Sequence, residues 1–466
     1  MAEWHVPGLS IAIVDHGRTI FAEGYGLRNV RRKLPMTAQT VQPIASVTKA
    51  FTATAVGILV DEKRLEWDTP VREYLPTFRL HDPVATERLT MRDLLCHRSG
   101  LPRHDFAWYR STRSRQEIFD RLRHLVPSRD LRTAWQYQNL MYMVAGLVIQ
   151  EVSGQTWEEF VCHRLLEPLA MRRSSVTVED LQKSDDYAVP HVARGSRVVE
   201  VQFYQQWAIA PAGAINSCVT NLAHWMAMNL AGGARGKTRI VSEAALREIH
   251  RPTAVVPFEQ LWPEVLQPTY GLGWQVQSYR GRPMLSHGGN IDGFSTLLTL
   301  MPEEKLGLVV LTNLHEQPTA RVVTFAALDL LLGERPAPWL QRLRGESRRQ
   351  KRLGAARRRK LAAVPTRGKV QPARPQADYV GEYRHKGYGT LRVERGRGRA
   401  LQVLWKDTVC AMRHLRADVF RFDFPQRGNQ QIVSFYADAD GCIDRLAVPF
   451  ESEGEPIAFV RDRPGK

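Results

Sequence analysis

The sequence has no apolar run long enough to cross a membrane and no closely spaced cysteines. A spanning helix needs ~20 consecutive apolar residues, and no stretch of this chain reaches that length. The five cysteines, Cys96, Cys162, Cys218, Cys410 and Cys442, are odd in number and contain no Cys-x-x-Cys pair. This spacing argues against a disulfide framework and against a zinc site. It is typical of reduced thiols in a cytoplasmic protein.

The N-terminus also lacks the features of a secretory signal. Residues Met1 to His5 are not a basic stretch followed by an apolar one, which is the pattern that marks such signals. We therefore expect a cytoplasmic protein, although a start further upstream would leave export open.

Positive charge is plentiful but unevenly spread. The net charge is +17, and residues 346–375 hold eleven Lys or Arg against one acid, a net +10. A basic tract can attract nucleic acid or lipid headgroups. Such tracts are more often solvated, helix-prone linkers, so we expect no nucleic-acid partner. An inactive hydrolase that docks through this tract stays a minor alternative.

The length of 466 residues predicts two or three domains. In the first 340 residues, apolar patterns predict strands at both ends and helices between them. The strands are expected at 9–14, 19–23, 270–277, 283–286, 295–301 and 306–312, and the main helices at 47–62, 90–97, 139–152, 217–230 and 324–332. If the two strand groups pair, they form one antiparallel sheet flanked by helices, with an all-helical region beside it.

The pattern changes after Gly345. A linker rich in Arg and Pro is followed by seven short strands between Thr390 and Arg461, separated by turns rich in Gly and Asp. Regularly spaced short strands predict a small barrel or sandwich. The expected fold class is therefore α+β, with domains at 1–340, 341–376 (basic linker) and 377–466 (all-β and barrel-like).

The first pattern that carries chemistry is Ser46-Val-Thr-Lys49, at the start of a predicted helix. Residues three apart on a helix have Cβ atoms ~5–6 Å apart, so Lys49 is expected beside Ser46. A serine hydroxyl is a weak nucleophile that needs a base or a nearby cation. The helix N-terminus adds a positive dipole end that favours developing negative charge. Alone this pattern is weak evidence, because Ser and Lys are common residues.

The second pattern is Tyr137-Gln138-Asn139, directly before a predicted buried helix. A tyrosine whose pKa is lowered by a neighbouring lysine can act as a general base. The amide of Asn139 could hold Lys49 or a substrate carbonyl. Considered alone, Tyr137 is more often explained as a packed core residue.

The third pattern is His287-Gly288-Gly289-Asn290, at the edge of a predicted strand. Two glycines let a substrate approach the backbone closely. The backbone N–H of Asn290 could pair with that of Ser46 as an oxyanion hole. His287 could bind a substrate carboxylate or assist proton movement, but a glycine turn with a surface histidine is the simpler explanation of this pattern alone.

The three patterns occur in the order found in a known group of enzymes. Ser-x-x-Lys, then Tyr-x-Asn, then His-x-Gly resembles the serine β-lactamase and penicillin-binding-protein superfamily. The sequence is most similar to its class C-like branch, which includes esterases and D-aminopeptidases. The resemblance extends to residues 6–14, to Leu94-Leu-Cys-His-Arg-Ser-Gly-Leu-Pro102, to Pro168-Leu-Ala-Met171 and to Tyr270-Gly-Leu-Gly-Trp274. The tail from Tyr379 resembles the lipocalin-like domain of some members.

This resemblance implies roles for the residues of the three patterns. Ser46 would be acylated, and Lys49 and Tyr137 would share the general-base work. Asn139 would orient the substrate amide or ester. The resemblance implies no metal and no organic cofactor.

The third pattern departs from that of true β-lactamases. The resemblance places His287 where those enzymes have lysine, and Gly288 where they have threonine. A neutral histidine offers no permanent charge to a drug's carboxylate. The departure favours an esterase or a D-amino-acid peptidase, with a β-lactamase or a penicillin-binding protein as the alternative. The expected partner is a small-molecule or peptide substrate, and oligomerisation through the C-terminal domain is left open.

Overall fold

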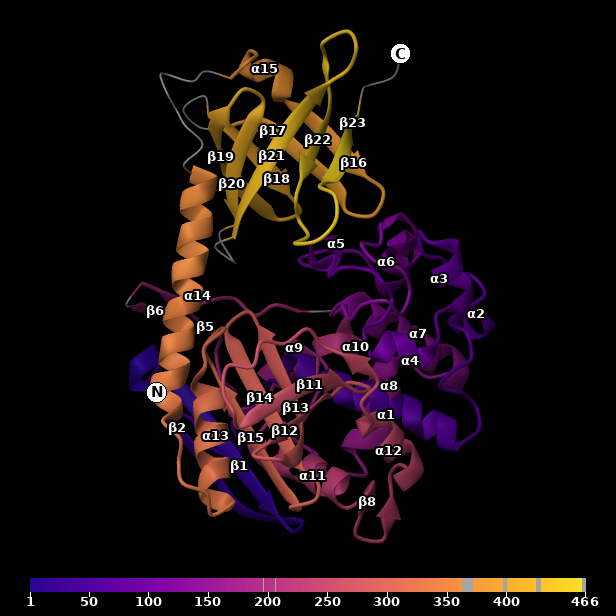
Figure 1. Cartoon of the computed structure of the whole chain (residues 1–466), viewed down its shortest axis with the longest axis vertical. Helices are drawn as coiled ribbons and strands as arrows, with labels where there is room; N and C mark the ends of the chain where they lie inside the picture. The colour runs from indigo at the N-terminus through magenta and orange to yellow at the C-terminus, as the bar shows by residue number, and fades with distance from the viewer. Residues whose placement is uncertain (196, 206, 363–371, 397–399, 425–428, 463–466) are drawn as a thin grey trace. The chain divides into compact units, whose positions relative to one another are not determined.

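The computed structural model describes residues 1–466 except 196, 206, 363–371, 397–399, 425–428 and 463–466. These residues form two compact units (Figure 1). The sheet unit comprises Met1–Phe78, Pro83–Gly100 and Arg129–Arg344, and the barrel unit comprises Arg79–Asp82, Leu101–Ser128 and Gly345–Lys466. Among the described residues, no helix combines the length and apolarity that a membrane crossing needs. All five cysteines are free.

A nine-stranded antiparallel sheet is the centre of the sheet unit. The first strand pairs with the last one of the later group, with Leu9 opposite Thr312. The predicted pairing of the two strand groups is therefore confirmed. The strand order is β10 (Ala254–Val255), β11 (Val265–Tyr270), β12 (Gln275–Tyr279), β13 (Arg282–Ile291), β14 (Phe294–Met301), β15 (Leu306–Thr312), β1 (Gly8–Asp15), β2 (Arg18–Asn29) and β3 (Leu34–Pro35).

Both faces of this sheet are covered, which is why every residue of β15 is buried. Val310 packs with Ala320 of α13 (Thr319–Leu331) on one face. On the other face, Gly307 lies against Met226 of α11 (Val219–Leu230). Because successive strand residues point to opposite faces, a strand covered on both sides reads as the continuous apolar run seen in the sequence.

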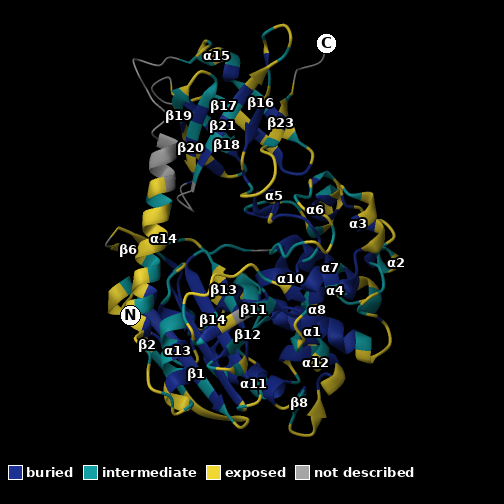
Figure 2. Cartoon of the chain, in the orientation of Figure 1, coloured by how far each residue is buried: buried dark blue, intermediate teal, exposed yellow. Residues whose placement is uncertain are grey.

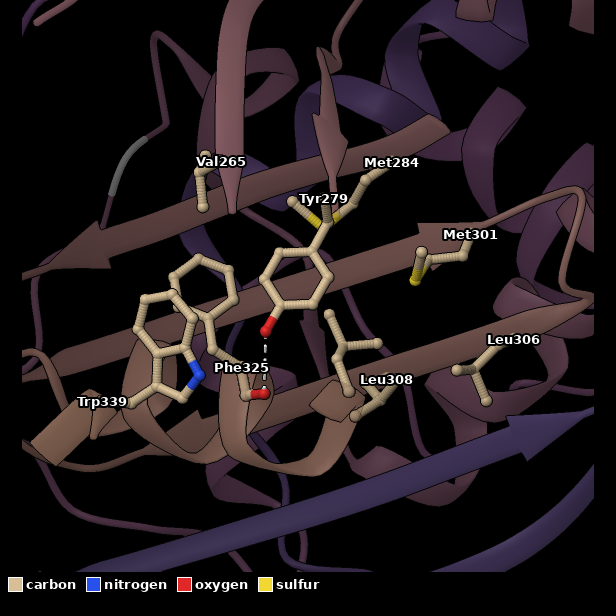
Figure 3. Close-up of a cluster of buried hydrophobic side chains, with 9 residues drawn as sticks. Val265, Tyr279, Met284, Met301, Leu306, Leu308, Phe325 and Trp339 are labelled. Atoms are coloured by element: carbon tan, nitrogen blue, oxygen red, sulfur yellow. Dashed lines mark hydrogen bonds between the residues drawn. The ribbon is translucent and has the colours of Figure 1, made fainter. Parts of the chain in front are cut away.

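A cluster of buried apolar and aromatic side chains joins α13 to the sheet (Figure 3). Tyr279 and Phe325 stack with their ring centroids 5.4 Å apart, and the Tyr279 hydroxyl donates to the carbonyl of Phe325 at 3.2 Å. Trp339, the first residue of α14 (Trp339–Ala362), closes the cluster. Its indole N–H donates to the buried carboxylate of Asp329 at 2.7 Å.

The helical region surrounds α1 (Thr48–Asp61), whose residues from Thr48 to Leu59 are all buried. Figure 2 shows α1 and the central strands as largely buried. A helix buried on all sides has no polar stripe, which explains why the residues of α1 from Thr48 to Leu59 are apolar or small apart from Lys49. The other helices here are α2 (Val71–Tyr74), α3 (Pro83–Arg88), α4 (Met91–Leu95), α7 (Asn139–Ser153), α8 (Trp157–Val161), α9 (Val178–Gln182), α10 (Ala210–Gly213) and α12 (Glu243–His250).

The single strand expected at 270–277 is wrong. Tyr270 ends β11 and Gln275 begins β12, and the chain turns between them. Gly273 has a positive φ of 79°, and a Cβ there would lie 2.7 Å from the carbonyl oxygen of Lys49. The turn is therefore pressed against α1 at a position that only glycine fits. The sequence prediction missed this turn because apolar and other residues alternate from Tyr270 to Gln277, as in a single strand.

The C-terminal strands close into an eight-stranded barrel, which confirms the predicted all-β, barrel-like domain, for which the sequence indicated seven strands. Its interior is packed with aromatic side chains, among them Tyr383, Phe420 and Phe435. The strands are β16 (Gly381–His385), β17 (Gly389–Arg395), β18 (Leu401–Trp405), β19 (Thr408–Arg416), β20 (Val419–Phe424), β21 (Asn429–Ala437), β22 (Ile443–Val448) and β23 (Ile457–Arg461). The sequence prediction missed β16, whose pairing with β23 completes the closure.

The stretch Leu101–Ser128 belongs to the barrel unit, although it interrupts the sheet unit in sequence. It carries α5 (Asp105–Trp108) and α6 (Arg115–Arg121). The ring of Phe106 lies 4.6 Å from Phe450 and 5.1 Å from Phe424, measured between centroids. Lys406 donates to the carbonyl oxygens of Phe106 and Tyr109. We call Leu101–Ser128 the barrel-bound segment.

Candidate active site

Ser46 lies in a short 3-10 helix, Ala45–Val47, that leads directly into α1. Its predecessor Ala45 has a positive φ of 49°, which is uncommon for a residue with a side chain and costs free energy. The turn is held by β13, because a Cβ on Gly289 would lie 2.2 Å from the carbonyl oxygen of Ile44. Gly289 therefore permits the close approach of β13 to the backbone that presents Ser46.

Lys49 is completely buried and its ammonium group contacts three acceptors. Its Nζ atom is 3.2 Å from Ser46 Oγ, 2.9 Å from Asn139 Oδ1 and 2.8 Å from the carbonyl oxygen of Ala212. The sequence predicted Ser46 as a neighbour of Lys49 and left the amide of Asn139 open between Lys49 and a substrate carbonyl, whereas the carbonyl of Ala212 on α10 was not predicted. A buried charge is tolerated when it is hydrogen-bonded in this way.

The ring of Tyr137 also lies near the ammonium group of Lys49. The Nζ atom of Lys49 is 4.8 Å from the centroid of the Tyr137 ring. The following residue, Gln138, caps α7 by accepting a hydrogen bond from the N–H of Leu140 at 2.9 Å. Ser46, Lys49, Tyr137 and Asn139 thus converge from two distant stretches of sequence.

His287 is buried beside this group and is neutral. Burial, with a smaller contribution from the charge of Lys49, lowers the pKa of His287 to about 3. Its Nδ1–H donates to the carbonyl oxygen of Gly288 at 2.7 Å, so Nε2 accepts from the Tyr270 hydroxyl at 2.8 Å. Burial raises the pKa of Tyr270 well above its usual range, which keeps this phenol a donor. No permanent positive charge is present on the imidazole.

The strand that carries His287 has a different environment on either side of this residue. β12 pairs with β13 from Arg282 to Ser286. From His287 to Ile291, the only described strand that pairs with β13 is β14. Asn290 is exposed, and its Oδ1 accepts from the hydroxyl of Ser295 at 2.8 Å. The strand therefore has an edge on which an extended substrate could lie.

The two glycines of the third pattern differ in what surrounds them. A Cβ on Gly288 would have only the carbonyl oxygen of Thr296 within 4 Å, at 3.8 Å, whereas Gly289 is in close backbone contact with Ile44. We predicted that both would admit a substrate. The close contact gives Gly289 a structural function, and the space at Gly288 is compatible with substrate approach. A role of either glycine in substrate binding stays a prediction.

Sequence reasoning assigned no role to Tyr270 or His97, and both contact the predicted residues. Tyr270 binds His287, and the ring of His97 lies 4.4 Å from that of Tyr137. Both occur in stretches that carry the family resemblance, which is the only sequence signal that could have found them. Within the described residues, no group of three or more His, Cys, Asp or Glu could hold a metal ion.

Known protein families match both parts of the chain. Residues 1–332 match the Beta-lactamase family, and residues 366–461 match a domain of unknown function, DUF3471. The chain is 29% identical to unguisins hydrolase ungD' of Aspergillus campestris, over 84% of this chain and 75% of the relative.

Solved structures show the same fold. The octameric penicillin-binding protein homologue from Pyrococcus abyssi has a TM-score of 0.65 at 25% identity, covering 99% of this chain and 97% of its own. A D-stereospecific amidohydrolase from Streptomyces sp. has a TM-score of 0.54 at 24% identity, covering 67% and 91%. Because the family match extends over most of its length, this chain belongs to the Beta-lactamase family.

Proposed function

We propose that this protein is a serine hydrolase that forms an acyl-enzyme at Ser46. The single observation that carries the proposal is the position of Lys49, whose Nζ lies 3.2 Å from Ser46 Oγ in a buried site. An amine at this distance can accept the serine proton once it has itself lost one, and the Tyr137 phenol beside it can share that work.

The proposed reaction has two steps, acylation of Ser46 and hydrolysis of the acyl-enzyme. Ser46 Oγ attacks the substrate carbonyl carbon while its proton passes to the Lys49–Tyr137 pair. The backbone N–H groups of Ser46 and Asn290 hold the negative oxygen that forms. Collapse of this intermediate expels an alcohol or an amine, which takes the proton. Water then attacks the acyl-enzyme with the same groups as base, releasing the acid and restoring Ser46.

We further propose that the substrates are esters, or amides and peptides that contain D-amino acids. The neutral His287 supports this choice, because it offers no fixed charge to a substrate carboxylate. Asn139 would orient the scissile group through its amide. The name of the Streptomyces neighbour is consistent with the D-amide class.

A class C-type β-lactamase or a penicillin-binding protein is the second candidate. It is supported by the family itself and by the complete set of Ser46, Lys49, Tyr137 and Asn139. A penicillin-binding protein would form the acyl-enzyme and release it slowly. The absence of a cation on the His287 side chain is the observation that places this candidate second.

A substrate panel tests these proposals. Initial rates should be measured on p-nitrophenyl esters, D-alanine and L-alanine p-nitroanilides and nitrocefin, with the Ser46→Ala variant as control. We expect hydrolysis of the esters or of the D-anilide, abolished in Ser46→Ala, and a mass increase of one acyl group on the intact protein. Activity that survives Ser46→Ala would contradict the mechanism, and efficient turnover of nitrocefin alone would favour the second candidate.

A further inference from the structure

The imidazole of His97 lies among the aromatic side chains around Lys49. It is fully buried. Its ring centroid is 4.4 Å from that of Tyr137 and 4.8 Å from that of Tyr270, which donates to His287. One ring therefore contacts both the phenol of the second sequence pattern and the partner of the histidine in the third.

The backbone on both sides of Tyr137 is hydrogen-bonded to His97. The N–H of Gln136 donates to the His97 carbonyl oxygen at 2.9 Å. The N–H of Gln138 donates to His97 Nδ1 at 3.1 Å, so this nitrogen carries no proton. Because the two bonds flank Tyr137, they restrain the backbone from which its phenol projects.

His97 is in turn restrained from the opposite direction. Its φ of 65° is in the left-handed region, where His and Asn occur more often than most residues with a side chain. The next residue, Arg98, forms an ion pair at 2.8 Å with the buried carboxylate of Asp93 on α4. The guanidinium of Arg132 binds the same carboxylate at 2.8 Å, and the backbone N–H of Arg132 donates to the carbonyl oxygen of Arg98 at 2.9 Å. Asp93 of α4 therefore anchors the backbone that follows His97, through both Arg98 and Arg132.

We propose that His97 is a positioning residue that holds the Tyr137 phenol beside Lys49 and Ser46. This inference rests on the proposed function, in which Tyr137 shares the general-base work. His97 acts through Tyr137: the Nδ1 acceptor fixes the backbone at Gln138, and the ring limits the rotation of the phenol. A shift of about 1 Å in a catalytic group can lower a rate by roughly 100-fold. Loss of the restraint on Tyr137 should therefore lower the rate of hydrolysis.

Two substitutions distinguish the contribution of the Nδ1 acceptor of His97 from that of its ring. His97→Asn keeps an acceptor oxygen near the position of Nδ1 and tolerates a positive φ, whereas His97→Phe keeps a ring and removes the acceptor. With an ester substrate, we expect His97→Phe to lower kcat by about 10- to 100-fold with KM changed less than about twofold, and His97→Asn to stay within about threefold of the unmodified protein. His191→Phe, at another buried histidine, is the matched control and should leave kcat unchanged.

A double-mutant cycle distinguishes positioning from general damage to the fold. If His97 acts through Tyr137, His97→Phe should have no further effect on kcat in the Tyr137→Phe background. Full activity of Tyr137→Phe alone would overturn the proposed role of Tyr137. If Tyr137→Phe is impaired, the proposal for His97 is overturned by unchanged kcat in His97→Phe, by equal losses in His97→Asn and His97→Phe, or by additive losses in the double variant.

Discussion

The Tyr270 hydroxyl donates a hydrogen bond to Nε2 of His287 at 2.8 Å. This bond occupies the nitrogen that would otherwise be available to take up a proton or to meet a substrate anion. Together with the bond from Nδ1 to the Gly288 carbonyl, it fixes the orientation of the imidazole, while burial and the nearby charge of Lys49 lower the pKa of His287 and keep the ring neutral.

Uncharged substrates should be preferred over those that carry a carboxylate near the scissile bond. A hydrogen bond to a charged partner contributes about 1.5–3 kcal/mol, so the absence of a cation on the His287 side chain should disfavour nitrocefin by roughly 10- to 100-fold in kcat/KM relative to an uncharged ester. His287→Lys should narrow this ratio. Steady-state kinetics on both substrates checks the prediction, and an unchanged ratio in His287→Lys would contradict it.

Alanine substitution should affect the two glycines of β13 differently. The Cβ of Gly289→Ala would lie 2.2 Å from the Ile44 carbonyl oxygen, so the turn that presents Ser46 must move. We expect a loss of about 1–3 kcal/mol in the free energy of unfolding, together with a lower kcat. Gly288→Ala, with its nearest contact at 3.8 Å, should change stability by less than about 0.5 kcal/mol. Chemical denaturation of both variants tests this, and similar losses would show that β13 is not in close contact with Ile44.

Stability should fall in acid because of buried neutral histidines. Burial lowers the pKa of His250 from 6.5 to about 3, so below about pH 6.5 the unfolded chain takes up a proton that the folded chain does not. The stabilisation is complete above pH 6.5 and is lost as the pH falls towards 3, by up to about 1.4 kcal/mol per pH unit. His250→Gln should therefore show a shallower decline between pH 6.5 and pH 4 in urea titrations. If the free energy of unfolding falls equally with pH in His250→Gln and in the unmodified protein, His250 does not contribute to the acid sensitivity.

The barrel-bound segment should depend on Phe106. This ring packs against Trp405, Phe424 and Phe450 and is 6% exposed. Phe106→Ala should cost about 3–5 kcal/mol in the stability of the barrel unit and should speed proteolysis within 101–128. Phe258→Ala, at a side chain that is 44% exposed, is the control. Thermal unfolding and limited proteolysis measure both effects, and unchanged cleavage of Phe106→Ala would contradict the predicted dependence.

Several elements of the fold could be predicted from short stretches of sequence alone. β1 and the buried α1 are recognisable as apolar runs that end in turn or charged residues, and the C-terminal strands as short runs at regular spacing. The pairing of Ser46 with Lys49 was also predictable, because both lie on one helical turn. The contact of Asn139 with Lys49 was one of two alternatives that the chemistry of an amide left open, the other being a substrate carbonyl, and the family resemblance implied only the role towards substrate.

The rest depends on contacts between residues that are distant in sequence. The break at Gly273 arises because this turn meets the backbone of α1. The membership of Leu101–Ser128 in the barrel unit depends on partners such as Lys406 and Phe450, which are roughly 300 residues away, where no local period can indicate a contact. The roles of His97 and Tyr270 were missed for the same reason, since their partners come from other elements.

The barrel unit is assembled from three separate stretches of sequence. Removing the residues after Gly345 would therefore leave the ring of Phe106 without Trp405, Phe424 and Phe450, against which it packs. In exchanging barrels between relatives, the barrel-bound segment and the C-terminal strands should be transferred together.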